Sequence, residues 1–530
     1  MTHVLVPLVV LLPLLGAALA LVTGRFPRLQ ILITTGTLAL VTIESIVLLV
    51  MVDSDGPAVI EVGAWPAPWG IVLMVDRLSA IMLVISSVVL LAVLLYAIGQ
   101  GIADGDRETP VTIFHPTYLM LAAGLAVAFV AGDLFNLYVG FEILLGASYV
   151  LLTLGGTGVR IRAGVTYIVV SLVSSVFFLA AIGLVYGATG TVNMAHVAER
   201  LETIPESTAL MLHVMLLLAF GIKAALFPMS FWLPDSYPTA PAPVTAVFAG
   251  LLTKVGVYAI IRLETLLFPD EGPGGDLTTP LLWIGLLTMV VGILGAAVQA
   301  DIKRLLSFTL VSHIGYMIFG IGLSSQLGLA ATVYYIVHHI TVQTTLFLAV
   351  GLVERVGDST SISRLSGLMK AAPAIAVLFL IPALNLGGIP PFSGFLGKTG
   401  LLLAGAEEGG WVVWVVIGGA VSTSLITLYA LMRVWNLAFW RSTVEVEAGY
   451  RSHLITDLVE SPEIDVASNT ASATPRLMVG VTTAMVAITV ALTVFAGPLF
   501  ALADRTAQEI GERDVLISTV LPQEVTDAEA

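Results

Sequence analysis

Long apolar runs follow one another along the whole chain, separated by short polar segments. A helix needs about 20 apolar residues to cross a bilayer. Runs of helix length lie near 4–23, 30–52, 73–98, 116–133, 134–155, 161–187, 208–233, 241–267, 280–299, 302–323, 327–353, 371–406, 411–438 and 476–502. The short alternating segments of a transmembrane barrel are absent from the sequence. The pattern predicts an all-α polytopic membrane protein with about 14 transmembrane helices.

Two of these runs contain helix breakers near their middle. Pro228 interrupts the seventh run, and Gly387, Gly388, Pro390 and Pro391 interrupt the twelfth. The backbone groups that proline frees must face protein or a watery cavity inside a membrane. Broken helices at corresponding positions of two repeats are typical of transport sites. Because five spans separate the breaks, we expect two inverted five-helix repeats, spans 4–8 and 9–13. Two unrelated proline kinks are the plainer alternative.

The spans and loops divide the chain into four expected parts. These are spans 1–3 with an outer hairpin (1–115), a first five-helix repeat (116–267), a second, inverted repeat (268–440), and a cytoplasmic loop with span 14 and an acidic tail (441–530). Residues 59–76 are rich in Gly, Pro and Trp and favour the hairpin. Residues 190–206 place Met194, Val197 and Leu201 at helical spacing, which favours a short interfacial helix. The polar loop and tail have compositions that favour partial disorder.

Composition supports a membrane location and narrows the chemistry. The chain is 58% hydrophobic and only 11% charged, against about 25% charged in soluble domains, and its mean hydropathy is +1.01. It has no cysteine, which excludes disulfides and cysteine-held iron–sulfur clusters within this chain. The net charge of −14 lies largely in loops and the tail. There is no basic patch, so nucleic acid is not an expected partner.

Lysine and arginine set the expected orientation, because cytoplasmic loops carry an excess of both. With the N-terminus outside, the inside loops hold Arg25, Arg28, Arg107, Arg160, Arg162, Lys303, Arg304, Arg355, Arg364, Lys370, Arg441, Arg451 and Arg476, and the outside segments hold only Arg77, Arg200, Arg262, Arg505 and Arg513. We therefore expect a multi-pass protein of the bacterial inner membrane with both termini outside. The first run lacks a basic n-region and is interpreted as an uncleaved span.

Three of the five lysines lie deep inside apolar runs, at Lys223, Lys254 and Lys398. A lysine at mid-bilayer depth costs about 2.5–3.5 kcal/mol, and a role in moving charge is the usual reason for it. Glu142 lies in the middle of the fifth run, where Lys223 is its expected partner; a static buried salt bridge is the alternative. Lys254 is placed to pass a proton between the two repeats, with snorkelling to the interface as the alternative. Lys398 has no acidic partner symmetric with Glu142, which suits proton release.

Histidines add candidates for a proton relay, because imidazole titrates near neutral pH. His338 and His339 lie in the eleventh run and His313 in the tenth. Neighbouring helical residues point to different faces, so we expect one of the adjacent pair to face the path. The plainer alternative is a core histidine bonded to a neighbouring backbone. His213 is a weaker candidate. Glu44 and Arg433 also lie in apolar runs, the former without a recognisable partner and the latter with an expected structural role.

The core of the sequence resembles the antiporter-like membrane subunits, the superfamily of Mrp cation/proton antiporters and of the large membrane subunits of respiratory complex I. The resemblance rests on GIKAALFPMSFWLPDSYPTAPAPVTAVFAGLLTKVGVYAIIR, with GFEILLGASYVLL, DIKRLLSFTLVSHIGYM and GGIPPFSGFLGKTGLL in matching order and spacing, over about residues 70–440. VGAWPAPWGIVLMVDRLSAIM is similar to the D subunits of Mrp complexes, and Lys398 fits those subunits too.

The resemblance implies a proton path along the membrane midplane. Glu142 and Lys223 would be the family's glutamate–lysine pair, Lys254 its central lysine, His338 or His339 its eleventh-span histidine, and Lys398 its terminal lysine. Several relatives carry a lysine one turn after that histidine, where this chain has Gln343. The departure leaves more of that step to histidine and water. The implied partners are other antiporter subunits, the lipid bilayer, H⁺ and Na⁺, with no cofactor.

These observations favour a proton-translocating subunit of a multisubunit Na⁺/H⁺ antiporter, a secondary transporter rather than an enzyme. The spans hold few carboxylates, so sodium is expected to pass through a neighbouring subunit or an interface, and no metal site is assigned. One alternative is a proton-pumping membrane subunit of a complex I-like oxidoreductase or a membrane-bound hydrogenase. The other is a scaffold that transports nothing, for which replacing Lys223 with alanine would leave ion exchange intact.

Overall fold

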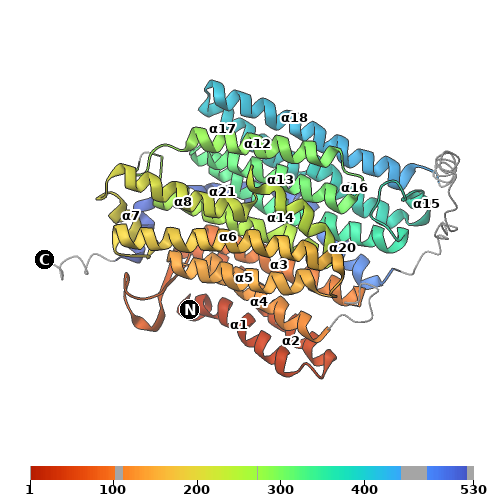
Figure 1. The fold of residues 1–530 in the computed structure, drawn as a ribbon, viewed down its shortest axis with the longest axis horizontal. Coiled ribbons are helices and arrows are strands. Elements are labelled where there is room, and N and C mark those ends of the chain that lie inside the picture. Colours follow the sequence, from red (N-terminus) through yellow and green to blue (C-terminus); the bar gives the residue numbers. More distant parts are fainter. Residues whose placement is uncertain (1, 102–110, 271, 443–473, 522–530) are drawn as a thin grey trace.

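The computed structural model describes residues 2–101, 111–270, 272–442 and 474–521, and Figure 1 shows that they form a bundle of helices. The first half contains α1 (Thr2–Val22), α2 (Pro27–Asp55), α3 (Arg77–Gln100), α4 (Val111–Val130), α5 (Leu134–Thr153), α6 (Gly158–Thr189), α7 (Met194–Leu201), α8 (Glu206–Ala224), η2 (Met229–Phe231), α9 (Trp232–Ser236), η3 (Tyr237–Thr239), α10 (Ala242–Val247), η4 (Phe248–Leu252), α11 (Thr253–Arg262) and η5 (Leu263–Leu267). The second half contains α12 (Thr278–Ala297), α13 (Ile302–Ile321), α14 (Gln326–Gly357), α15 (Leu368–Ala371), α16 (Pro373–Gly387), α17 (Ser393–Glu408), α18 (Trp411–Val434), η6 (Trp435–Trp440), α20 (Arg476–Val494), α21 (Ala496–Gly511) and α22 (Arg513–Val520).

Thirteen helical stretches within the described residues are long and apolar enough to cross a membrane. They correspond to all of the predicted spans except the twelfth. That span is present as two shorter helices, α16 and α17, on either side of a break. The prediction of a polytopic all-α membrane protein is confirmed, and the missing length is explained by the helix breakers that the sequence places there.

Both predicted breaks are present, at the same place in two successive sets of five spans. The helix α8 ends at Ala224, with Ala225 in the left-handed region at φ 60°, and only the short helices η2, α9 and η3 complete that span. The helix α16 ends at Gly387, with Gly388 at φ 78°, and α17 begins at Ser393. Because the broken spans are the seventh and the twelfth, five places apart in the order of spans, they run in opposite directions across the bilayer, as inverted repeats require.

The two structured connections are also present. β1 (Ala58–Glu61) and β2 (Val72–Val75) pair antiparallel, with Ala58 opposite Val75, and the short helix η1 (Val62–Ala64) follows β1. α7 buries Met194, Val197 and Leu201 against the bundle. The hairpin and the connecting helix therefore lie where the pattern of apolar and turn-forming residues predicts them.

The C-terminal segment differs from the prediction. The last span ends at Val494 instead of residue 502, and the chain continues as α21 and α22 where a polar, partly disordered tail was expected. In α21, Ala503, Thr506, Ala507 and Ile510 are buried, so an apolar stripe at helical spacing lies among the charges. Residues 443–473 and 522–530 of the predicted loop and tail lie outside the described residues.

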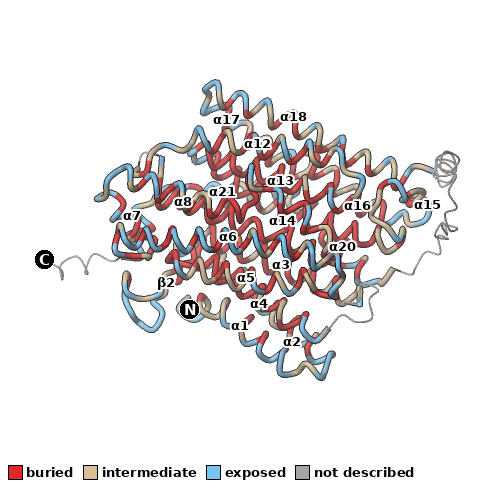
Figure 2. Tube along the Cα trace, in the orientation of Figure 1, coloured by how far each residue is buried: buried red, intermediate tan, exposed pale blue. Residues whose placement is uncertain are grey.

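Burial increases towards the middle of the bundle (Figure 2). The eighth span, Ala242–Leu267, is buried over its whole apolar window and α14 over 94% of its window. The helix α14 contacts α10 of the first five-span set and α13, α16 and α17 of the second, so it lies at their junction. The peripheral helices α1, α2, α6 and α18 expose many large apolar side chains, as helices in contact with lipid do.

The described ends of the chain lie on the same face as the β-hairpin. The helix α1 packs against β1 and β2, and Arg505 of α21 pairs with Asp53 at the end of α2 at 2.7 Å. This agrees with an even number of crossings. The assignment of that face to the outside stays a prediction, and we call the opposite face, which carries Arg160 and Arg304, the basic face.

Candidate functional site

The predicted relay residues are distributed over both five-span sets and are mostly inaccessible to solvent. Lys254, His313, His338 and His339 are fully buried, Lys398 and Lys223 are 5% and 8% exposed, and Glu142 is half-buried. They come from α5 (Glu142), α8 (Lys223), α11 (Lys254), α13 (His313), α14 (His338, His339) and α17 (Lys398). Two of them, Lys223 and Lys398, lie next to the helix breaks.

Lys223 lies in the last turn of α8, one residue before the break. Its Nζ donates to the Ser171 carbonyl at 3.3 Å and to Ser175 Oγ at 3.0 Å, both on α6, and it lies 5.8 Å from the centre of the Phe141 ring. No ion pair joins Lys223 to Glu142 among the described residues. The predicted direct contact is therefore not formed, because oxygens of α6 satisfy the ammonium and the ring next to Glu142 lies against it.

Lys254 begins α11 directly after the π-helical turn η4. Its Nζ donates to the carbonyl of Ala249 in that turn at 2.8 Å. A π-helical turn shifts the backbone hydrogen bonds by one residue and is frequent at functional sites. Because the side chain is fully buried and bonded within the span, the snorkelling alternative is wrong.

The histidines form one aromatic cluster at the junction of the two sets. His313 Nδ1 lies 2.6 Å from Tyr335 Oη, and the His313 and His339 rings stack with centroids 5.2 Å apart. His338 Nδ1 lies 2.9 Å from Ser393 Oγ, which donates to Asn385 Oδ1 at 3.2 Å. Both adjacent histidines, His338 and His339, are buried, and the expectation that one of them faces the proton path stays a prediction. The helix α14 is surrounded by protein, so both of its faces are interior.

Lys398 lies beside the second break, as Lys223 lies beside the first. Its Nζ donates to the Leu386 carbonyl at 3.0 Å and to Ser424 Oγ at 2.9 Å, and it lies over the Tyr316 ring at 5.1 Å. The carbonyl that the break frees thus serves the amine. Gln343, at the position where several relatives have lysine, donates to the Leu306 carbonyl at 2.7 Å.

The three weaker candidates lie apart from this row. His213 Nε2 lies 2.9 Å from Glu264 Oε1, and its ring stacks on Phe268. Arg433 donates to the carbonyls of Ala297 and Gln299, so it joins α18 to the end of α12 and has the structural role expected of it. Glu44 is buried, and neither of its carboxylate oxygens has a hydrogen-bond partner among the described residues.

A second buried cluster of charges, built around Arg262 and Asp76, was not predicted from the sequence. Arg262, counted with the outside segments in the sequence, lies in α11 and is 2% exposed. Its guanidinium makes two bonds of 2.6 Å to Asp76, the N-cap residue of α3. Burial alone would raise the pKa of Asp76, but the charge and hydrogen bonds of Arg262 lower it below the ordinary value. The signal was available, since Arg262 lies inside the run 241–267, two turns after Lys254.

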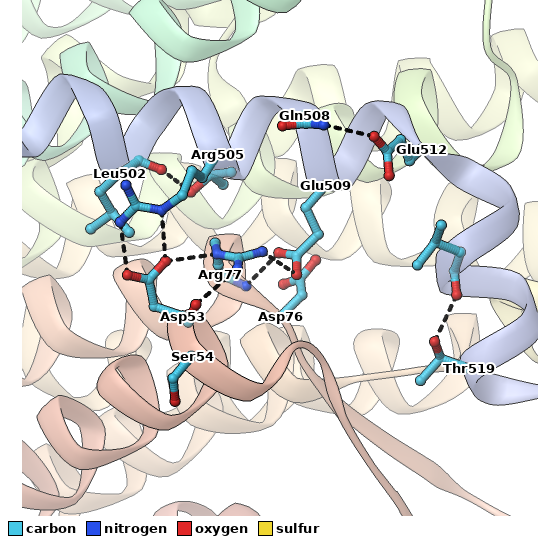
Figure 3. Close-up of polar contacts among 12 residues, drawn as sticks. Asp53, Ser54, Asp76, Arg77, Leu502, Arg505, Gln508, Glu509, Glu512 and Thr519 are labelled. Carbon is cyan, nitrogen blue, oxygen red and sulfur yellow. Dashed lines mark hydrogen bonds and ion pairs between the residues drawn. The ribbon is translucent and has the colours of Figure 1, made fainter.

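The same cluster joins α21 to the start of α3 (Figure 3). Arg77 donates to Glu509 through its backbone N–H and its guanidinium, both at 2.9 Å, and to Asp53 at 2.8 Å. Arg505 bonds the same Asp53 from α21 at 2.7 and 3.0 Å. Because the sequence predicts a partly disordered tail around Glu509, it gives no reason to connect this residue with Arg77.

Ionisable side chains at two broken helices, with others buried between them, are typical of a membrane protein that moves ions. The comparisons with known proteins are more specific. Residues 131–427, more than half of the chain, match the model of the NADH:quinone oxidoreductase/Mrp antiporter transmembrane family. The chain belongs to this family.

The similar proteins include curated antiporter subunits over nearly the whole length. The chain is 36% identical to the D subunit of the Na⁺/H⁺ antiporter of Alkalihalophilus pseudofirmus, over 98% of this chain and 99% of that one. It is 34% identical to the corresponding D subunit of Bacillus subtilis, over 81% and 86%.

Solved structures of the same fold come from both antiporters and respiratory complexes. A chain of the Mrp complex from a Dietzia species superposes with a TM-score of 0.84 at 28% identity, over 98% of this chain and 99% of that one. A chain of an archaeal membrane-bound sulfane sulfur reductase superposes almost as well, with a TM-score of 0.83 at 27% identity, over 97% and 99%.

Proposed function

We propose that this chain is a proton-translocating subunit of a multisubunit Na⁺/H⁺ antiporter of the inner membrane. The observation that carries the proposal is the set of buried amines and imidazoles between Lys223 and Lys398, with an amine beside each of the two breaks. The similarity to antiporter D subunits over nearly the full chain supports this assignment, and the partners would be the other membrane subunits of such a complex.

Protons would be held by the lysines and passed on through the histidine cluster. Each lysine donates to carbonyl or hydroxyl oxygens and not to a carboxylate. Because these oxygens are neutral, a lysine that gives up its proton leaves no unpaired carboxylate charge behind. Between Lys254 and Lys398, an imidazole accepts a proton at one ring nitrogen and releases one from the other. The contacts from His313 to Tyr335 and from His338 to Ser393 are short enough for such transfers.

Glu142 would act on Lys223 through its charge, because the two side chains make no direct bond. Movement of the ammonium towards α5 would bring the charges together, and movement towards α6 would separate them. Since opposite charges favour each other's ionised form, this displacement is the proposed electrostatic switch. Sodium is assigned to a neighbouring subunit or an interface, since it prefers several oxygen ligands and the relay is built mainly from nitrogen.

A second candidate function is a proton-pumping membrane subunit of a redox complex. The near-equal superposition on a chain of the sulfane sulfur reductase favours keeping this alternative. In that case other subunits would carry the redox centres. Purification of the native complex distinguishes the two, because an antiporter would contain only membrane subunits, whereas a redox complex would contain subunits with bound iron–sulfur clusters.

The relay is tested by replacing its amines in the assembled complex. We expect Lys223→Ala, Glu142→Ala and Lys398→Ala each to lower sodium-driven pH changes in membrane vesicles by at least about tenfold, since positioned proton-transfer groups contribute about 10²–10⁴-fold. The measurement is the initial rate of the pH change after sodium addition. Lys370→Ala, at an exposed lysine on α15, is the matched control. Normal exchange by an assembled Lys223→Ala complex would refute the relay and favour the scaffold.

A further inference from the structure

A small cavity lies beside Lys223 at the first helix break. Its polar lining consists of Lys223, Ser171, Tyr167, Trp232 and Tyr237, and apolar side chains from α5, α6, α8 and η4 complete it. The volume is about 20 Å³. A site needs about 10–15 Å³ of this kind of space, and two to four polar partners, to hold one water molecule. The cavity therefore has the size and the chemistry of a site for a single water.

Two side chains of the lining have polar atoms without a protein partner. Tyr237 is fully buried, and its Oη has no hydrogen-bond partner among the described residues. The same holds for Nε1 of Trp232, a residue that is 5% exposed. An unsatisfied buried polar group costs about 1–3 kcal/mol. Tyr167, in contrast, is satisfied by Ser148 at 2.9 Å. A water in the cavity that reached both atoms would satisfy Tyr237 and Trp232 together.

The segment that carries Tyr237 leads from Lys223 to the basic face. Tyr237 begins η3, which ends at Thr239, and the Thr239 carbonyl accepts a bond from Arg160 at 3.2 Å. In α9, the exposed Asp235 pairs with Arg304 at 2.8 Å. Tyr237 therefore lies in the sequence and in space between the amine at the break and the surface that the distribution of arginine and lysine predicts to be cytoplasmic.

We propose that this cavity is a water-binding site and that Tyr237 is the group that passes protons between it and the basic face. For each proton that leaves, the N–H bond of the Lys223 ammonium breaks as the water gains that proton and gives one of its own to Tyr237 Oη. In the same event the phenol gives its original hydroxyl proton to solvent water that reaches it from the basic face, so no charge stays on the ring. The reverse sequence loads Lys223. The inference rests on the proposed relay.

The packing of Tyr237 allows its hydroxyl to be tested alone. The ring contacts Trp232, Tyr167 and Phe248, with centroids 5.7, 6.4 and 5.6 Å away, and Tyr237→Phe keeps these contacts while it removes only Oη. Val170 also lines the cavity, so Val170→Ile adds one methylene there without touching a polar group. The matched control is Tyr118→Phe, which removes the hydroxyl of another buried tyrosine, bonded to the Leu90 carbonyl at 2.8 Å in a different part of the fold.

The experiment measures exchange in vesicles of the assembled complex while the pH is varied on one side at a time. We expect Tyr237→Phe and Val170→Ile to lower the rate at least about tenfold and to change its dependence on the pH of the basic-face side, with the dependence on the opposite side unchanged. The control should resemble the wild type. Equal changes on both sides, or an unchanged rate, would overturn the proposal. If the Tyr237→Phe complex fails to assemble, the same measurements on Val170→Ile test the proposal. Failure of the relay itself is distinguished by Lys223→Ala, which would then exchange normally.

Discussion

At the scale of single residues, the buried charges fall into two groups with different partners. The relay lysines donate to carbonyl and hydroxyl oxygens, so each can lose or gain a proton without stranding a charged partner. Arg262 and Asp76 instead form a bidentate pair, 186 positions apart in the chain. A guanidinium stays protonated in proteins and its fork matches a carboxylate. The first group therefore suits proton movement, and the second suits permanent structure.

The contribution of the Arg262–Asp76 pair to the stability of the protein is tested by removing one partner. Arg262→Leu should lower the free energy of unfolding by about 3–5 kcal/mol, because it leaves the Asp76 carboxylate buried without its counter-charge. The measurement is the thermal midpoint of the purified complex in detergent. Replacing both partners with apolar residues, as in Asp76→Leu with Arg262→Leu, should restore part of the loss.

Arg505→Leu is the matched control for that measurement. Arg505 also pairs with a carboxylate, Asp53, but it is 46% exposed, and exposed pairs contribute about 0–1 kcal/mol. Equal thermal midpoints for Arg262→Leu and Arg505→Leu would contradict the structural role assigned to the buried pair.

At the scale of elements, the eighth span shows why a continuous apolar run can hide a functional irregularity. The run 241–267 predicts one helix, but the structure divides it into α10, η4, α11 and η5. The π-helical turn η4 supplies the carbonyl that accepts from Lys254, and it packs against α14, which carries His338 and His339. The turn therefore sets the position of the amine relative to the second five-span set.

Gly250 makes the close approach between η4 and α14 possible, which yields a prediction. A Cβ at this position would overlap Thr344 Oγ1 of α14. A threonine in a helix has only two common χ1 rotamers, so relief requires a change of rotamer that gives up its bond to the Ala246 carbonyl. Gly250→Ala should therefore lower the thermal midpoint, by a cost of about 1–3 kcal/mol for overpacking, and reduce ion exchange in vesicles.

The rescue variant separates this clash from other effects of alanine. Gly250→Ala with Thr344→Ala removes the overlapping oxygen, and the remaining neighbours of the new Cβ lie at ordinary distances, so stability and exchange should recover together. Gly183→Ala on α6, where an added Cβ meets nothing within 4 Å, should behave as the wild type. Failure of the double variant to recover would show that the glycine is needed for another reason.

At the scale of the whole molecule, the C-terminal helix ties distant parts of the chain together. Through Arg505 and Glu509, α21 bonds the end of α2 and the start of α3 (Figure 3). Asp76, the N-cap residue of α3, is bonded in turn to Arg262. Burial and the Asp76 charge raise the pKa of Glu509 to about 7, although bonding and charge from Arg77 and the charge of Arg262 lower it. The ordinary value for glutamate is about 4.3, so the folded state binds this proton more tightly than the unfolded chain does.

That pKa predicts a pH dependence of stability. Stabilisation by the bound proton is fully present below about pH 4 and is lost as the pH rises through about 7. Glu509→Gln carries no titrating group, so the thermal midpoint of the wild type should fall relative to this variant between about pH 5 and 8. Glu512→Gln, at an exposed glutamate on the same side of the bundle, should leave the wild-type profile unchanged. A difference between wild type and Glu509→Gln that is constant with pH would contradict the prediction.

Much of the fold and part of the site could be predicted from the sequence. The spans, both breaks, the hairpin and α7 follow from local patterns of apolar and turn-forming residues. Lys223, Lys254, Lys398 and the histidines follow because a polar side chain in an apolar run is conspicuous. The predicted contact between Lys223 and Glu142 was wrong, and the helix α21 was not predicted. The first error arose because no local pattern shows which side chain a lysine will meet, and the second because net acidity hid a narrow apolar stripe.

The sequence by itself determined how many times the chain crosses the bilayer, where two crossings break, and which ionisable groups lie inside. These properties depend on bilayer thickness and on backbone chemistry, which act along the chain. Only the tertiary structure decided the partners. They are serines and freed carbonyls for the lysines and an aspartate for Arg262, and the cavity at the first break is lined by a tyrosine whose hydroxyl has no partner among the described residues. Partners are set by side-chain packing between residues far apart in the chain, for which the sequence carries no local signal.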